Sequence, residues 1–335
     1  MLVLLYLDVD LPATQYAIYV AIMYVLWGMT YTIMDIPYWS MVPALTDNEN
    51  ERSQVSAIPR FFASMAWLVV GSGGLYIVKY AGNGDQILGF SRFSIGVALI
   101  FIVTILLTVF NTKERVVATV GTGEKTTVKQ MIKVLVKNDQ VIVIMLIALL
   151  FNVGYQLANS FALYYFEYVC GVKENLFAAY TGVAGFAQMG ALALFPIISQ
   201  KINKKVIFAT ASLLPVIGFA LLLLVGYVAP TSILLVGLCS VIVNIGIGFM
   251  LVLITVILSE VVDYGEYKLH TRNESILFST QTFVVKFAGA FSGLISGVGL
   301  KAIGFEANQV QGAGTIAGMR IIMIVIPAIL SLLCL

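Results

Sequence analysis

Three charged residues stand alone in long apolar stretches of the sequence. They are Asp35 in residues 16–45, Arg60 in residues 57–78 and Lys286 in residues 275–300. A charge at the centre of a bilayer costs roughly 2.5–3.5 kcal/mol on insertion scales, so such residues face a water-filled cavity or a partner. The pattern therefore predicts either a buried site for a polar ligand or a structural salt bridge that ties helices together.

The neighbours of Asp35 favour a sugar as the ligand. Thr32, Asp35 and Trp39 are spaced i, i+3 and i+7, which places them on one helix face. A carboxylate can accept two hydroxyl hydrogens, and an indole offers a flat surface to the apolar face of a sugar. Arg60 and Lys286 would donate to further hydroxyls and keep Asp35 ionised. The alternative for Trp39 is a place in the aromatic belt of the membrane interface.

The composition predicts an all-α polytopic membrane protein. Of the 335 residues 60% are hydrophobic and 11% are charged, whereas a soluble domain carries about 25% charged residues. The net charge of +2 gives no reason to expect a nucleic-acid partner. The three cysteines show no ligand spacing, and the single histidine, His270, excludes metalloprotease chemistry that needs a histidine pair. We expect no cofactor and no structural metal.

We expect nine membrane-spanning helices, because a helix crosses the hydrocarbon core in roughly 20 residues. The expected spans are residues 16–40, 57–78, 93–112, 141–166, 176–199, 206–228, 233–259, 275–300 and 316–335. Alternation of these spans puts the connections 41–56, 113–140, 200–205 and 260–274 on one side. That side holds twelve Lys and Arg residues against five on the other. The excess predicts that these four connections are cytoplasmic.

The long polar connection divides the chain into three regions. We expect a first helical bundle in residues 1–112, a central cytoplasmic loop in 113–140 and a second bundle in 141–335. The bundles echo one another, since Asp35 precedes Arg60 by 25 residues and Asp263 precedes Lys286 by 23. Repeated bundles around a central site are typical of secondary transporters.

Two further patterns concern helix packing. Glu260, Asp263 and Glu266 lie near Lys268 and Arg272 at a cytoplasmic helix end, which predicts either an ion-pair latch or a solvated face. A ladder of small residues on the helix of Lys286 predicts close approach of another helix. Its members are Gly289, Gly293 and Gly297.

Two long motifs resemble a known family. They are YVLWGMTYTIMDIPYWSMVPALTDNENERSQVSAIPRFFAS at residues 24–64 and EVVDYGEYKLHTRNESILFSTQTFVVKFAGA at residues 260–290. Both are similar to the melibiose-carrier family, the glycoside–pentoside–hexuronide:cation symporters of the major facilitator superfamily. The resemblance covers essentially the whole chain.

The resemblance implies a fold of twelve helices in two six-helix bundles that alternate between inward-open and outward-open states. The nine expected spans would be helices four to twelve. By similarity, the first bundle would bind a galactoside through Asp35, Trp39 and Arg60, with Tyr31 nearby. The second bundle would complete the site with Lys286, Gln281 and Thr282, and Thr32 matches the threonine of the family's cation site.

The chain departs from the family at its start. The cation-binding carboxylates of the family lie on helix two and another sugar-binding acid lies on helix one, and neither helix aligns with this chain. We therefore expect an N-terminally truncated carrier from a bacterial inner membrane. Its parent would couple uptake of a melibiose-like galactoside to Na⁺, or to H⁺ or Li⁺. The alternatives are a non-transporting fragment or sugar sensor and an intramembrane enzyme, although no nucleophile or metal constellation is visible for an enzyme.

Overall fold

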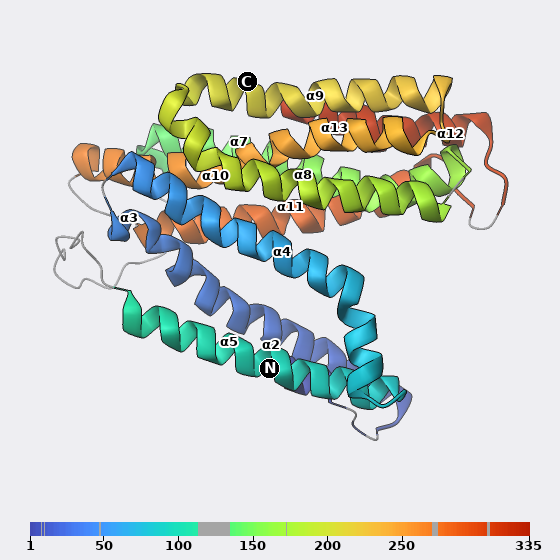
Figure 1. Ribbon diagram of the computed structural model, residues 1–335, viewed down its shortest axis with the longest axis horizontal. Helices are drawn as coiled ribbons and strands as arrows, with labels where there is room; N and C mark the ends of the chain where they lie inside the picture. The colour runs from blue at the N-terminus through green and yellow to red at the C-terminus, as the bar shows by residue number, and fades with distance from the viewer. Residues whose placement is uncertain are drawn as a thin grey trace. The chain divides into compact units, whose positions relative to one another are not determined.

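The computed structural model describes residues 1–7, 9, 11–46, 48–112, 135–171, 173–269, 274–306 and 309–335 (Figure 1). Almost all of the described chain is helical, which confirms the predicted fold class. The helices form two compact units. The first consists of Met1–Thr46 and Ala66–Val117, and the second of Asp47–Met65 and Ala118–Leu335. The boundary between them falls inside one long helix, α4.

The first unit contains α1 (Leu2–Leu5), α2 (Ala13–Ser40), α3 (Val42–Leu45), the later part of α4 (Glu49–Ala81) and α5 (Gln86–Asn111). Helix α1 packs against both α2 and α5. The ring of Tyr6 stacks on Phe90 with 5.8 Å between centroids, and the Tyr19 hydroxyl donates to the Leu4 carbonyl at 2.6 Å. These contacts join the start of the chain to the two long helices of this unit.

A tight turn connects α4 to α5. Asn83 and Gly84 both have positive φ, and the Asp85 carboxylate caps α5 by accepting from the backbone N–H of Ile87 at 2.9 Å. A Cβ atom on Gly89 would lie 2.2 Å from the Val78 carbonyl oxygen. The turn therefore depends on glycine, because no side chain fits at this approach.

The second unit combines the start of α4 with the remaining helices. These are α7 (Asp139–Tyr164), its π-helical continuation η1 (Tyr165–Val169), α8 (Lys173–Lys201), α9 (Lys204–Val228), α10 (Ile233–Leu269), α11 (Glu274–Ala302), α12 (Ala313–Arg320), the π turn η2 (Ile321–Val325) and α13 (Ile326–Leu332). Helix α10 packs against α8 and α9, and α7 packs against α11 and α13 (Figure 1). Phe161, Phe166, Phe195 and Phe278 are among the fully buried side chains of this core.

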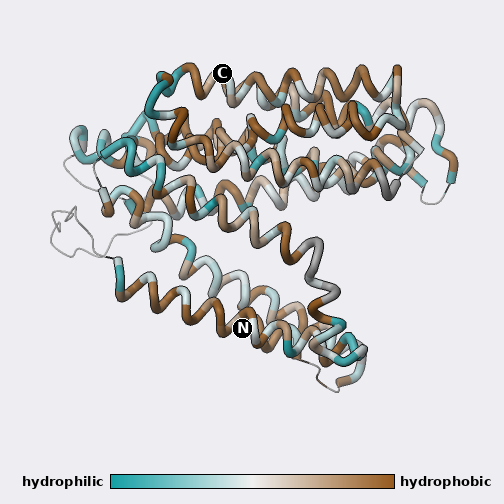
Figure 2. Tube along the Cα trace, in the orientation of Figure 1, coloured by the Kyte–Doolittle hydropathy of each residue, from teal (hydrophilic) through white to brown (hydrophobic). Residues whose placement is uncertain are grey.

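Eight helices of the described chain are long and apolar enough to cross a membrane. Helix α4 is not among these eight, but it contains the remaining one of the nine predicted spans, residues 57–78. The other predicted spans also lie within helices, apart from up to three residues at a C-terminal end. In the second unit, hydrophilic residues gather where α4 and α9 begin and where α10 ends (Figure 2). Most of the predicted loop 113–140 lies outside the described residues, so the three-region division stays a prediction.

The structure corrects the expected start of the helix that carries Arg60. The expected span 57–78 puts Arg60 near the start of its helix, but α4 begins at Glu49, and Pro59 is interior. The polar residues before Pro59 are compatible with a helix, and two acidic residues in the first turn favour it through the helix dipole. Membrane helices tolerate an interior proline, because neighbouring groups satisfy the carbonyl that it leaves unbonded.

Candidate functional site

Helix α2 brings Asp35 and Trp39 into direct contact. The indole Nε1–H of Trp39 donates to Asp35 Oδ1 at 3.1 Å, and both side chains are partly buried. The edge of the Tyr38 ring meets Trp39 with 5.4 Å between centroids. One turn of one helix therefore presents a carboxylate and an oriented indole together.

The residues that precede Asp35 are held within α2. Tyr31 is exposed, and its ring lies 6.1 Å from that of Trp27. The Thr32 hydroxyl donates to the Gly28 carbonyl at 2.7 Å, a bond within its own helix. Pro37 lies inside the helix and has no N–H to donate, so the backbone next to Asp35 lacks one helical hydrogen bond.

The remaining predicted ligands belong to the second unit. Arg60 lies on α4, and its Nη2 donates to Thr255 Oγ1 on α10 at 2.5 Å. Helix α11 carries Gln281 and Thr282, which are partly buried, and Lys286, which is exposed. Because the two groups of residues belong to different units, their meeting at one site stays a prediction.

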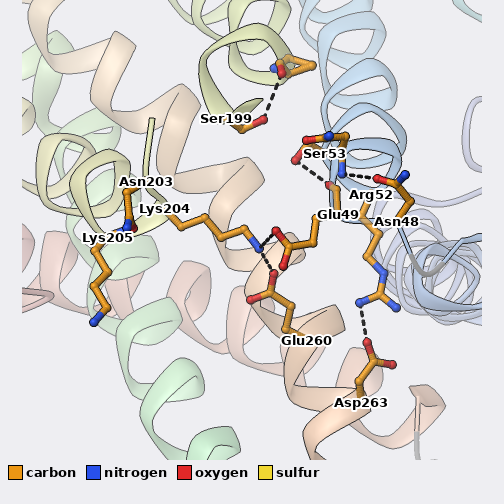
Figure 3. A network of polar contacts seen from close by, with 12 residues as sticks. Asn48, Glu49, Arg52, Ser53, Ser199, Asn203, Lys204, Lys205, Glu260 and Asp263 are labelled. Carbon is orange, nitrogen blue, oxygen red and sulfur yellow. Dashed lines mark hydrogen bonds and ion pairs between the residues drawn. The ribbon is translucent and has the colours of Figure 1, made fainter. Parts of the chain in front are cut away.

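An ion-pair network joins α4, α9 and α10 at their polar ends (Figure 3). The Lys204 ammonium contacts Glu260 and lies 3.0 Å from Glu49 Oε2. Arg52 Nη1 lies 2.5 Å from Asp263 Oδ2, and the side chain of Arg52 is only 3% exposed. All these side chains lie in segments that the charge pattern predicts to be cytoplasmic.

The network differs from the predicted ion-pair latch in its partners. The acids Glu260 and Asp263 pair with Lys204 and Arg52. Lys268, the expected base, pairs with Asp139 at 2.7 Å, whereas Arg272 lies outside the described residues, as does His270. The roles of Lys204 and Thr255 were not predicted from the sequence, because their partners lie far away in the sequence and no neighbouring residue indicates the pairing. One usable signal was the eight-residue spacing that Arg52 and Arg60 share with Thr255 and Asp263.

Acidic ligands for a metal are not gathered in the described chain. Within it, no group of three or more His, Cys, Asp or Glu side chains could hold a metal ion. The contribution of Thr32 to a cation site stays a prediction.

Comparison with known proteins identifies the family. The family model described as "MFS/sugar transport protein" matches residues 1–335. The chain belongs to this family. It is 26% identical to the uncharacterized symporter YjmB of Bacillus subtilis, with 98% of this chain and 70% of that protein covered. It is also 25% identical to the lactose permease of Leuconostoc lactis, over 96% of this chain and 50% of the permease.

A further relative and a solved structure are also similar to this chain. An isoprimeverose transporter of Lactiplantibacillus pentosus is 27% identical, over 89% of this chain and 62% of that protein. The chain thus spans between half and about two thirds of the length of several relatives. The Escherichia coli fucose:proton symporter FucP superposes with a TM-score of 0.61 at 14% identity, covering 90% of this chain and 73% of that one. This likeness supports the major facilitator fold.

Proposed function

We propose that the protein is part of a sugar:cation symporter that works by alternating access. The single observation that carries the proposal is the Asp35–Trp39 pair, a carboxylate bonded to an indole within an apolar, membrane-length helix. Family membership supports it, as do relatives named as permeases, transporters and symporters of sugars. Such relatives also favour transport over catalysis.

The sugar would be a galactoside of the melibiose type. Asp35 would accept hydrogen bonds from two sugar hydroxyls while Trp39 covers the apolar face of the ring. Arg60 and Lys286 would donate to further hydroxyls. Tyr31, Gln281 and Thr282 would line the same site, as the resemblance to the melibiose-carrier family implies.

Coupling would follow from a bound Na⁺, or from H⁺ or Li⁺, with Thr32 as one ligand. The cation would raise the affinity for sugar, and by linkage the sugar must raise the affinity for the cation by the same factor. A bacterial inner membrane would supply the cation gradient. A protein of this kind would need no cofactor.

The test is uptake of radiolabelled melibiose, raffinose and lactose by cells that lack their own carriers, with and without a Na⁺ gradient. Because several relatives are considerably longer, the chain is expressed both as its 335 residues and with upstream coding sequence. Sodium-stimulated uptake that Asp35→Ala abolishes would support symport. Binding without accumulation would favour a sugar sensor, and neither binding nor uptake would refute the proposal.

A further inference from the structure

The start of α4 and the end of α10 meet along a polar seam within the second unit. Arg52 pairs with Asp263, and Arg60 pairs with Thr255. From Arg52 to Arg60 the chain advances eight residues on α4, and from Asp263 to Thr255 it goes back eight residues on α10. This is the register of two antiparallel helices. Midway between the two contacts this register places Ser56 opposite Ser259, and both serines are fully buried.

The seam is lined by small and polar groups. Thr255 and Ser259 are 0% exposed, and the Ser259 hydroxyl donates to the Thr255 carbonyl at 3.0 Å. The Ser56 hydroxyl is buried and makes no hydrogen bond within the described chain. Helices joined through such polar side chains can separate into water at little cost, because water replaces each polar contact.

The Thr255 hydroxyl can accept a hydrogen bond from Arg60 while it keeps its own hydrogen bond within α10. Its hydroxyl hydrogen is directed to the Leu251 carbonyl at 3.4 Å, one turn back on α10. An oxygen lone pair therefore remains for the guanidinium, which approaches at 2.5 Å. A hydrogen bond from a charged donor to a fully buried acceptor is stronger than a neutral one. It fixes one end of a side chain that otherwise has many rotamers.

We propose that Thr255 is the positioning residue for Arg60 in the sugar site, and that it acts only while the α4–α10 seam is closed. With Nη2 fixed on Thr255, the plane of the Arg60 guanidinium has a set direction in the proposed sugar site. Opening the seam withdraws Thr255, so Arg60 loses its orientation and the sugar is released. This inference rests on the proposed sugar-binding role of Arg60.

The inference links sugar affinity to the state of the seam in both directions. If the closed seam binds sugar more tightly, bound sugar must favour the closed seam by the same factor. A double variant, Ser56→Cys with Ser259→Cys, reports closure through its rate of disulfide formation with copper phenanthroline. We expect melibiose to increase this rate, and each single cysteine variant controls for background reaction.

Substitution of Thr255 separates positioning from packing. Thr255→Val keeps the shape but removes the acceptor, and we expect the equilibrium affinity for radiolabelled melibiose to fall about tenfold. Thr255→Ser retains the hydroxyl and should bind nearly as the parent does. Thr181→Val is the matched control, because within the described residues the Thr181 hydroxyl bonds only the Phe177 carbonyl of its own helix, at 2.8 Å.

The decisive measurement uses the disulfide-locked double variant. There the seam cannot open, so a purely structural role of Thr255 would leave sugar affinity unchanged by Thr255→Val. Positioning predicts that the locked Thr255→Val form still binds about tenfold more weakly than its locked parent. Equal affinities in the two locked forms, or a disulfide rate that melibiose leaves unchanged, would overturn the inference alone. No melibiose binding by any form would overturn the proposed function together with it.

Discussion

The hydrogen bond between Trp39 and Asp35 needs only one turn of α2 to form. It restricts the indole to one orientation and gives one carboxylate oxygen a fixed donor. Orientation matters for a sugar, because stacking on an indole requires the ring plane to face the apolar side of the pyranose. In the proposed sugar site, this local geometry would orient two of the ligands before any other helix contributes.

This pair gives a prediction for substitutions of Trp39. Trp39→Phe keeps an aromatic face but loses the Nε1 donor, so we expect about fivefold weaker sugar binding, equivalent to roughly 1 kcal/mol for one hydrogen bond. Trp39→Ala also loses the stacking surface and should bind more weakly still. Equilibrium binding of radiolabelled melibiose measures both. Trp67→Phe is the control, because Trp67 is 80% exposed; an equal loss there would contradict the role of Trp39.

The cysteines give a second prediction at this scale. Cys170, just beyond η1, is 7% exposed, and burial raises the pKa of its thiol to about 11. At pH 8 roughly one thiol in a thousand would be ionised, and the thiolate is the nucleophile. We expect the native protein to react with N-ethylmaleimide far more slowly than a Val310→Cys variant, because position 310 is fully exposed. The reaction rate of the native protein should rise as the pH is raised through 9–10. Rapid labelling at pH 7 would show that the thiol is accessible.

Only part of the candidate site could be predicted from the sequence. The shared face of Asp35 and Trp39 follows from helical periodicity alone. The partner of Arg60 could not be found in this way, because Thr255 is 195 positions away and threonine is common in apolar helices. Pairing over such separations depends on helix register, which a single sequence does not specify.

At the scale of elements, helices α4 and α10 extend beyond the apolar spans that hydropathy delimits. Hydropathy predicts the hydrocarbon-crossing part, and the predicted spans 57–78 and 233–259 lie inside these two helices. Hydropathy does not predict whether the polar residues next to a span continue its helix into water. The connections 41–56 and 260–274 are largely helical. These polar extensions carry the ion pairs of Figure 3.

Lys204 gives a prediction for these extensions. Its ammonium lies between the carboxylates of Glu49 and Glu260, so Lys204→Gln leaves two like charges facing one another. Because Glu49 is largely exposed, the loss should be modest, about 1 kcal/mol, and larger at low salt. Thermal unfolding in detergent measures it. Lys205→Gln is the matched control, since Lys205 makes no ion pair in the described chain, and Glu49→Gln should partly restore the Lys204→Gln variant.

The glycines of the second unit give another prediction. The ladder on α11 was expected to mark close packing, but a Cβ atom on Gly293 or Gly297 would meet nothing within 4 Å. One of the close approaches in this unit is at Gly246 on α10, where a Cβ would lie 2.5 Å from the ring of Pro215. We expect Gly246→Ala to destabilise the protein by about 1–3 kcal/mol through overpacking. Gly293→Ala should be neutral or stabilising, and the reverse order in thermal unfolding would contradict the packing shown here.

At the scale of the whole molecule, charge and hydropathy together predict the membrane orientation. The cytoplasmic assignment rests on twelve basic residues against five. It also places the α4–α10 seam and the Lys204 network at the same face, where opening would admit water from the cytoplasm. Under the proposed function, the orientation therefore decides whether the seam would control sugar release into the cell or sugar entry from outside.

Single exposed cysteines on opposite sides test this orientation. Tyr267, 83% exposed, lies in a connection predicted to be cytoplasmic, and Val310, fully exposed, lies in one predicted to face outward. With a membrane-impermeant maleimide, intact cells should label Val310→Cys and leave Tyr267→Cys unlabelled, and inside-out vesicles should give the opposite result. The native cysteines add little background, because all three are buried. Labelling of Tyr267→Cys from outside would invert the topology, and the seam would then be an external gate, which would act on sugar entry.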